Sequence, residues 1–314
     1  MDHRGELLRD EAELQRIAAL AIPPAWTDVH VAPDASRKIQ AWGRDAASRK
    51  QYVYSAAYVA RRERRKWGRV LRYGRVLPRL REVTNLHLKA PRYHRERVLA
   101  TVVRLMSRAY FRVGSERYAV LNRTFGICTL AKSHLEVDGF TLRFRYTGKR
   151  RKDQRQVVAD TPLVEIVAEL LDLPGARLFQ YVDAARRVRP VTADAINQYL
   201  CEILGDRYTS KDLRTFGGTV RAATILSDLG PAASEREATR NLALTTRLVA
   251  LELGNTPAIA RKAYIHPAVL DAYRRSGCTI TIPPGGLSRP VEAEAPNTLY
   301  PEEAALIRFL ERYG

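Results

Sequence analysis

Apolar residues in this chain recur mainly at helical spacing, and strand-like alternation is confined to short runs. Three such runs, separated by Pro, Gly and Asp, cluster near the N-terminus at residues 29–31, 38–42 and 51–55. Farther along, residues 95–110 place apolar side chains three and four positions apart, as one face of a helix requires. We therefore expect an α+β protein in which a small β-rich, mostly antiparallel domain precedes a larger, mainly α-helical domain.

The domain boundary is predicted near residue 90. A short helix at residues 10–21 opens the chain, and a basic helical run at residues 58–71 follows the strands. The stretch 88–94, which contains a proline, has the composition of a linker. Residues 1–90 then form the N-terminal domain, and residues 91–314 form the helical one.

Capping residues mark helix ends in the helical domain. Helices are predicted to begin at Thr161, after Thr192 and Ser234, and at Thr256, because Ser and Thr accept hydrogen bonds from the first helical N–H groups. Gly254 can end the preceding helix in a left-handed conformation. One β-hairpin interrupts the helices: residues 140–146 alternate between apolar and polar, and a second strand at residues 156–159 follows a turn.

The positive charge is concentrated in one segment. The chain has 53 Lys and Arg against 34 Asp and Glu, a formal net charge of +19. Residues 51–150 alone hold 24 basic and 6 acidic residues, an excess of 18, while the rest of the chain is close to neutral. Solubility requires no such segregation, so nucleic acid or another polyanion is the expected partner. An anionic membrane surface fits less well, because the segment does not form one clean basic amphipathic helix.

No membrane span, metal site or nucleotide site is predicted. The longest apolar runs fall short of the about 20 residues that a span needs, and the N-terminus lacks a signal-peptide apolar region. A cytoplasmic protein is therefore expected, associated with the nucleoid if the source is bacterial. Cys128, Cys201 and Cys278 match no metal-ligand spacing and are expected to be core thiols. The pair Gly148-Lys149 is not part of a P-loop, so we expect no cofactor.

Two strings in the helical domain contain groups suited to phosphodiester chemistry: KDLRTFG at residues 211–217 and LGNTPAIARKAY at residues 253–264. Transesterification needs a nucleophile, donors for charge developing on the nonbridging oxygens, and a proton for the departing alkoxide. Tyr264 can supply the nucleophile. Arg214 and Asn255 can supply donors.

Two further basic residues extend this set. Arg112 follows the helix at residues 95–110 and is close to Gly114, whose small size would let a DNA backbone approach. Lys149 lies in the hairpin turn TGKRRKD, an exposed place for a proton donor. Taken alone, a basic residue of this kind is more readily explained by an ion pair or by solvation.

The order of these residues along the chain resembles that in the catalytic core of the poxvirus-like, including bacterial, type IB DNA topoisomerases. That order is Arg112, Lys149, Lys211, Arg214, Asn255 and Tyr264. The likeness runs through FRVGSERYAVLNRTFGICTL at residues 111–130, YTGK at 146–149 and the two strings above. It extends more weakly to RKQYVY at 49–54, and it covers nearly the whole helical domain.

The resemblance implies a role for each residue. Tyr264 would form a 3′-phosphotyrosyl link and leave a free 5′-hydroxyl. Arg112 and Arg214 would hold the scissile phosphate, Lys149 would protonate the departing 5′-oxygen, and Lys211 would be a supporting phosphate contact. The two domains of a monomer would clamp duplex DNA, and the enzyme would relax supercoils without ATP or a metal.

Asn255 departs from the family pattern, because the eukaryotic and poxvirus members usually have histidine at this position. An amide can still donate a hydrogen bond to a nonbridging oxygen, and it does not titrate. In the N-terminal domain the resemblance makes Gln51, Tyr52 and Tyr54 DNA contacts. Strand alternation places the two tyrosines on one face and Gln51 on the other, so the face that meets DNA is not defined.

Two other interpretations stay open. A tyrosine site-specific recombinase uses similar chemistry, but its usual HxxR motif is KDLR here. The small β-rich N-terminal domain also fits a topoisomerase better than the helical core-binding domain of a recombinase. A noncatalytic DNA-binding protein would bury Tyr264 and form no covalent adduct with DNA.

Overall fold

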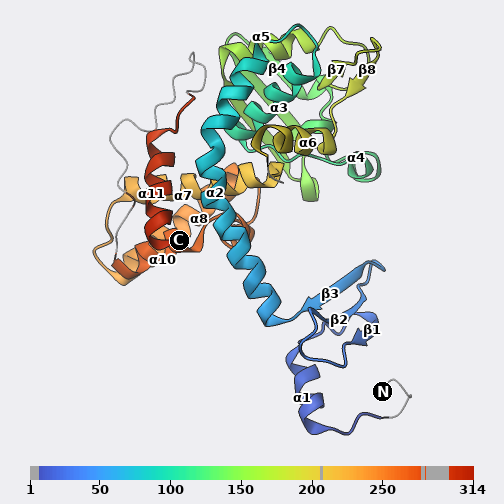
Figure 1. The fold of residues 1–314 in the computed structure, drawn as a ribbon, viewed down its shortest axis with the longest axis vertical. Coiled ribbons are helices and arrows are strands. Elements are labelled where there is room, and N and C mark those ends of the chain that lie inside the picture. Colours follow the sequence, from blue (N-terminus) through green and yellow to red (C-terminus); the bar gives the residue numbers. More distant parts are fainter. Residues whose placement is uncertain (1–6, 206–207, 277–279, 281–296) are drawn as a thin grey trace. The chain divides into compact units, whose positions relative to one another are not determined.

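The computed structural model describes residues 7–205, 208–276, 280 and 297–314 (Figure 1). Its internal contacts divide the chain into two compact units, residues 1–68 and 69–314. Helix α2 (Ala56–Leu88) begins in the first unit and ends in the second. The mixed α+β class is confirmed, and a functional division near residue 90 stays a prediction.

The first unit is a three-stranded antiparallel sheet with one helix, as the sequence predicted. Its elements before α2 are α1 (Glu11–Ala19), β1 (Thr27–Val31), β2 (Ile39–Arg44) and β3 (Lys50–Tyr54), with strand order β1-β2-β3. Asp10 caps α1 by accepting from the N–H groups of Ala12 and Glu13. Arg16 of α1 donates to the side chain of Gln40 and to the carbonyl of Ala32, which ties the helix to the sheet.

The second unit is mainly helical. After α2 its helices are α3 (Arg95–Ala109), α4 (Glu116–Asn122), α5 (Thr161–Leu170), α6 (Ala193–Leu204), α7 (Ser210–Leu229), α8 (Glu235–Glu252), α9 (Pro257–Ala263), α10 (Pro267–Ser276) and α11 (Pro301–Tyr313). One sheet has the order β4 (Leu135–Asp138), β5 (Thr141–Thr147), β6 (Asp153–Ala159), and a hairpin pairs β7 (Gln180–Val182) with β8 (Val188–Pro190). The core centres on α3, which is buried without a break over residues 98–106.

Most of the predicted helix ends are confirmed. Thr192, Ser234 and Thr256 each accept a backbone N–H at the start of a helix, and Gly254 has the left-handed φ of 62°. The predicted hairpin corresponds to β5 and β6. The sequence did not predict β4, which adds a third strand, nor did it predict α11.

The cysteines, which the sequence predicted to be core thiols, lie in different environments. Cys128 is buried, Cys201 is half-buried, and Cys278 lies outside the described residues. Among the described residues, His, Cys, Asp and Glu form no group of three or more that could hold a metal ion. In the same part of the chain, no helix has the length and apolar content to cross a bilayer.

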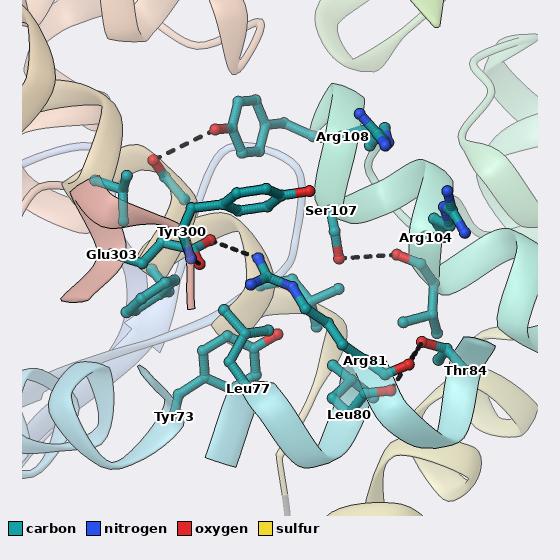
Figure 2. A pocket seen from close by; sticks show the side chains of 16 residues that line it. Tyr73, Leu77, Leu80, Arg81, Thr84, Arg104, Ser107, Arg108, Tyr300 and Glu303 are labelled. Carbon is teal, nitrogen blue, oxygen red and sulfur yellow. Dashed lines mark hydrogen bonds and ion pairs between the residues drawn. The ribbon is translucent and has the colours of Figure 1, made fainter. Parts of the chain in front are cut away.

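Helix α11 packs against α7, and polar contacts tie it to α2 (Figure 2). Arg81 of α2 donates to the buried carboxylate of Glu303 at 2.7 Å, and its guanidinium carbon lies 4.3 Å from the centre of the Tyr300 ring. A buried ion pair of this kind fixes orientation because each charge needs its partner. These contacts line a pocket between α2, α3, α7 and α11.

A second buried charge network joins α3 to α5. The Asp160 carboxylate is fully buried and accepts from the guanidinium groups of Arg104 and Arg108, at 2.9 and 2.7 Å. Its other oxygen accepts from the N–H of Leu163 and so caps α5. One carboxylate therefore holds two helices together.

We expect Asp160→Asn to destabilise the second unit by about 3–5 kcal/mol, because buried Arg104 and largely buried Arg108 lose the charge of the Asp160 carboxylate while the cap can persist. Urea unfolding measures this difference. The control is Glu82→Gln, which breaks the Arg79–Glu82 pair; both of its side chains are more than half exposed, so stability should change little. Equal effects of the two substitutions would contradict the prediction.

Candidate active site

One pocket of the second unit collects four of the residues predicted to act in catalysis. Arg112, Lys149, Asn255 and Tyr264 all line it. Arg214 lies close by, with its guanidinium carbon 5.2 Å from the centre of the Tyr264 ring. Segments separated by as many as 152 positions in the chain thus meet at one site.

Two arginines hold the loop between α8 and α9. Arg214 donates to the carbonyl oxygen of Leu253 at 2.8 Å and also to that of Tyr110. Arg112 donates to the carbonyl oxygen of Gly254 at 2.7 Å and to the side-chain oxygen of Asn255. The loop that presents Asn255 is therefore positioned from α7 on one side and from the segment after α3 on the other.

Burial dominates the electrostatics of these arginines. Desolvation lowers the pKa of Arg112 and of Arg214 from the ordinary arginine value, and Arg214 is only 4% exposed. A guanidinium nevertheless stays protonated in proteins, so both groups supply positive charge in a site of reduced solvent access. Such charges interact more strongly with an anionic ligand than exposed arginines do.

Tyr264 is half-buried at the carboxyl end of α9. The helix predicted to begin at Thr256 is α9, which ends at Ala263, and Tyr264 is its C-cap. Its N–H still donates to the carbonyl of Ala260. A position at the end of a helix leaves the side chain facing the pocket, where Arg112 and Lys149 also lie.

Asn255 is oriented by its arginine neighbour. Its Oδ1 accepts from Arg112, which leaves the amide NH2 group as the donor. Within the described residues, this Nδ2 atom is buried and has no hydrogen-bond partner. Buried donors are usually paired, so the arrangement suits an acceptor atom brought by a ligand.

Lys149 follows β5 in a tight turn and is exposed. The next two residues, Arg150 and Arg151, have left-handed φ values of 64° and 55°, and Gly148 packs on the buried side chain of Gln154. The turn thus has a fixed base and a solvent-facing tip. No ion pair joins Lys149 to an acidic side chain in the parts of the chain that the structure describes, so its ammonium group can approach a ligand.

Comparison with known proteins identifies the family. The family model for the eukaryotic DNA topoisomerase I catalytic core matches residues 48–279, and that for the bacterial DNA topoisomerase IB N-terminal domain matches residues 1–45. The chain belongs to the type IB DNA topoisomerases. It is 30% identical over 271 residues to DNA topoisomerase 1B of Acanthamoeba polyphaga mimivirus, covering 84% of this chain and 81% of the relative. DNA topoisomerase 1B of vaccinia virus (strain Copenhagen) is 24% identical over 274 residues, covering 84% and 83%.

Not every predicted DNA contact of this type IB topoisomerase lies in the pocket. Lys211 is exposed in the first turn of α7 and does not line it. In the first unit, Tyr52 is 43% exposed and its ring centre lies 6.1 Å from that of Tyr54, while Lys50 extends over Trp42. This forms an exposed row of aromatic and cationic groups.

Gln51 points away from that row. It lies on the opposite face of β3, and its side-chain amide donates to the carboxylate of Asp45 at 2.9 Å. Its partner on β2 is Gly43, which is buried. The structure therefore separates Gln51 from the two tyrosines, as strand alternation predicted.

Some residues of the site were missed by sequence reasoning. Burial raises the pKa of the Tyr146 hydroxyl to about 12, although Arg214 and Arg112 act in the opposite direction, so this tyrosine stays neutral beside the two arginines. Gly114 packs on Gly126, since a Cβ added to Gly114 would lie 3.0 Å from the Gly126 nitrogen, and its approach to a DNA backbone stays a prediction. A glycine in the sequence indicates that another group lies close to the backbone there, but it does not identify that group.

Gly217 supports Arg214 through Tyr110 in the topoisomerase. A Cβ added at Gly217 would lie 2.2 Å from the ring carbon Cε1 of Tyr110, whose carbonyl accepts from Arg214. Glycine at this position lets the tyrosine ring lie against α7. The carbonyl of Tyr110 is thereby held where the Arg214 guanidinium can reach it.

We expect Gly217→Ala to slow DNA strand cleavage by about 10-fold or more, because a displaced Tyr110 would shift Arg214 and small misplacements are costly in catalysis. Single-turnover cleavage of a defined duplex measures the rate. Ser227→Ala, on the same helix and away from the pocket, is the control and should cleave normally. If Gly217→Ala cleaved DNA at the wild-type rate, this role of Gly217 would be contradicted.

Proposed function

We propose that this enzyme relaxes supercoiled double-stranded DNA by cutting one strand with Tyr264 and then resealing it. The observation that carries the proposal is the shared pocket: Tyr264, Arg112, Asn255 and Lys149 line it together, with Arg214 against the tyrosine ring. This set provides a nucleophile, phosphate donors and a proton donor. Membership of the type IB family supports the same activity.

In the cleavage step the Tyr264 oxygen attacks the scissile phosphorus and forms a 3′-phosphotyrosyl ester. The bond from phosphorus to the 5′-oxygen breaks, the tyrosine proton leaves to solvent, and Lys149 donates a proton to the departing 5′-oxygen. Exposure at the tip of its turn suits Lys149 to this role. Religation is the reverse: the 5′-hydroxyl attacks, Lys149 takes the proton, and Tyr264 leaves.

Arg112, Arg214 and Asn255 would stabilise the charge on the nonbridging oxygens. Each guanidinium has five N–H donors in a planar fork, so the bonds to loop carbonyls leave donors for a phosphate. The Nδ2 atom of Asn255, whose orientation is fixed by Arg112, can donate to a third acceptor. Preorganised donors of this kind usually give the largest part of such a rate enhancement.

The energy of the cut phosphodiester is kept in the tyrosyl ester, so religation needs no ATP. Rotation of the free 5′ end between the two steps removes supercoils. We further propose that the enzyme acts as a monomer, because one chain supplies every proposed catalytic group, and that it works in the cytoplasm, at the nucleoid in a bacterium. Lys211 and the row with Tyr52 and Tyr54 would add phosphate and base contacts outside the pocket, and the predicted N-terminal and helical domains would clamp the duplex.

The alternatives have less support. Both family models belong to topoisomerases, which favours relaxation over site-specific recombination. A noncatalytic DNA-binding protein would bury Tyr264, whereas this tyrosine is half-buried and lines a pocket with four basic residues.

We expect Tyr264→Phe to bind DNA with wild-type affinity and to form no covalent adduct, because the substitution removes only the nucleophilic oxygen. The assay is incubation with supercoiled plasmid in EDTA without nucleotide, followed by detection of protein linked to the 3′ end. The wild-type enzyme should relax the plasmid under these conditions. An adduct in the phenylalanine variant would move the nucleophile elsewhere.

Lys149 and Arg214 should respond differently to a better leaving group. Lys149→Ala should slow cleavage by about 10²- to 10⁴-fold, the usual worth of general acid catalysis. A substrate with sulfur in place of the bridging 5′-oxygen needs no proton on departure, so it should restore most of the rate. Arg214→Ala should not be restored, because its proposed partner is a nonbridging oxygen. Equal restoration of both variants, or of neither, would contradict this division of roles.

A further inference from the structure

A buried threonine of α7 is hydrogen-bonded to the backbone around the proposed nucleophile. Thr219 is fully buried, and its Oγ1 donates to the carbonyl oxygen of Tyr264 at 3.2 Å. Thr219 Oγ1 also accepts from the backbone N–H of His266 at 3.2 Å. Its proton is shared with the carbonyl of Thr215, 2.8 Å away in the preceding turn. One hydroxyl therefore joins α7 to both sides of Ile265.

A neighbouring glycine allows this close approach. A Cβ added to Gly218 would lie 2.9 Å from the carbonyl oxygen of Tyr264 and 3.4 Å from its Cβ. Only a residue without a side chain lets the tyrosine backbone come so near to α7. The contact and the hydrogen bonds are independent observations, and both place the backbone of Tyr264 against the same turn of the helix.

The segment that contains Tyr264 connects two helices, and His266 at its far end accepts from the N–H groups of Ala268 and Val269 in the second. Helix α9 ends at Ala263, and α10 begins at Pro267. The N–H of Tyr264 is bonded within α9, but its carbonyl and the N–H of His266 are bonded to Thr219. The connection between the two helices is thus fixed from α7, the helix that also contains Arg214.

We propose that Thr219 is a positioning residue that sets the backbone of Tyr264 relative to Arg214, so that the tyrosine oxygen meets the phosphorus held by the arginine. This inference rests on the proposed role of Tyr264 as the nucleophile. Attack requires the reacting atoms within about 3–3.5 Å and in line, and a misplacement of about 1 Å can cost about 10²-fold in rate. Without the hydroxyl, the buried N–H of His266 would lose its acceptor, and the segment would shift to find another.

The experiment compares substitutions at Thr219 with a control on the same helix. Thr219→Val removes the hydroxyl and keeps the branched side chain, and Thr219→Ser keeps the hydroxyl. The control is Thr224→Val on the same helix, where a buried threonine donates to the Val220 carbonyl of its own helix. Single-turnover cleavage, religation from the covalent adduct, noncovalent DNA affinity and thermal unfolding are measured for each variant.

We expect Thr219→Val to slow cleavage and religation together by about 10- to 100-fold, with unchanged DNA affinity and no greater loss of thermal stability than Thr224→Val. Thr219→Ser should recover most of both rates. The 5′-sulfur substrate should not restore Thr219→Val, since the defect lies in the nucleophile and not in the leaving group. Gly218→Ala removes no hydrogen bond but places a methyl group against the backbone of Tyr264, so it should lower the same two rates. It tests the positioning role if the valine variant does not fold.

Three outcomes would overturn the inference: a wild-type rate in Thr219→Val, or in Gly218→Ala if the valine variant does not fold; an equal loss in Thr224→Val; or restoration by the sulfur substrate. These differ from failure of the proposed function. If Tyr264→Phe still formed an adduct, the nucleophile assignment would fall and this inference with it. If Tyr264→Phe formed none while Thr219→Val cleaved normally, only the positioning role would be lost.

Discussion

The site depends on two arginine side chains that are withdrawn from water beneath the loop at residues 253–255. Arg214 and Arg112 donate to successive groups of this loop, from the carbonyl of Leu253 to the side chain of Asn255. Desolvating a guanidinium is costly, and these hydrogen bonds to oxygen offset part of the cost. A phosphate would bring the opposite charge to the same place, so under the proposed function the free site already holds hydrogen-bond donors for the substrate.

Helix α7 organises this site because several of its residues contact the segments that form the site. Arg214 donates a hydrogen bond to the loop after α8, and Gly217 leaves room for the ring of Tyr110. Thr219 donates a hydrogen bond to the backbone carbonyl of Tyr264. A helix is stiff over this length, so these contacts cannot move independently. The proposed nucleophile, Tyr264, and Arg214, proposed to hold the phosphate, are therefore spaced by one rigid element, although they belong to different segments of the chain.

The sequence predicts the parts of this structure that depend on local chemistry. Thr192 and Gly254 take the conformations that capping rules require, and the hairpin turn with Lys149 follows from alternation and turn residues. What it misses depends on partners far along the chain. Nothing local marks Asp160 as the partner of Arg104, or Arg81 as that of Glu303, because these pairs form only when separate helices pack.

The candidate site shows the same division. Tyr264, Arg214 and Asn255 were predicted from residue type and order, yet the proposed role of Asn255 depends on a contact that no pattern shows. An amide alone could present either its oxygen or its nitrogen to a phosphate. Arg112 takes the oxygen, so the nitrogen is left as the donor. A histidine in this position would need a proton to serve as a charged donor, whereas the oriented amide donates at every pH at which the arginines are charged. The substitution that departs from the family pattern is thus compatible with the same chemistry, provided that Arg112 keeps its place.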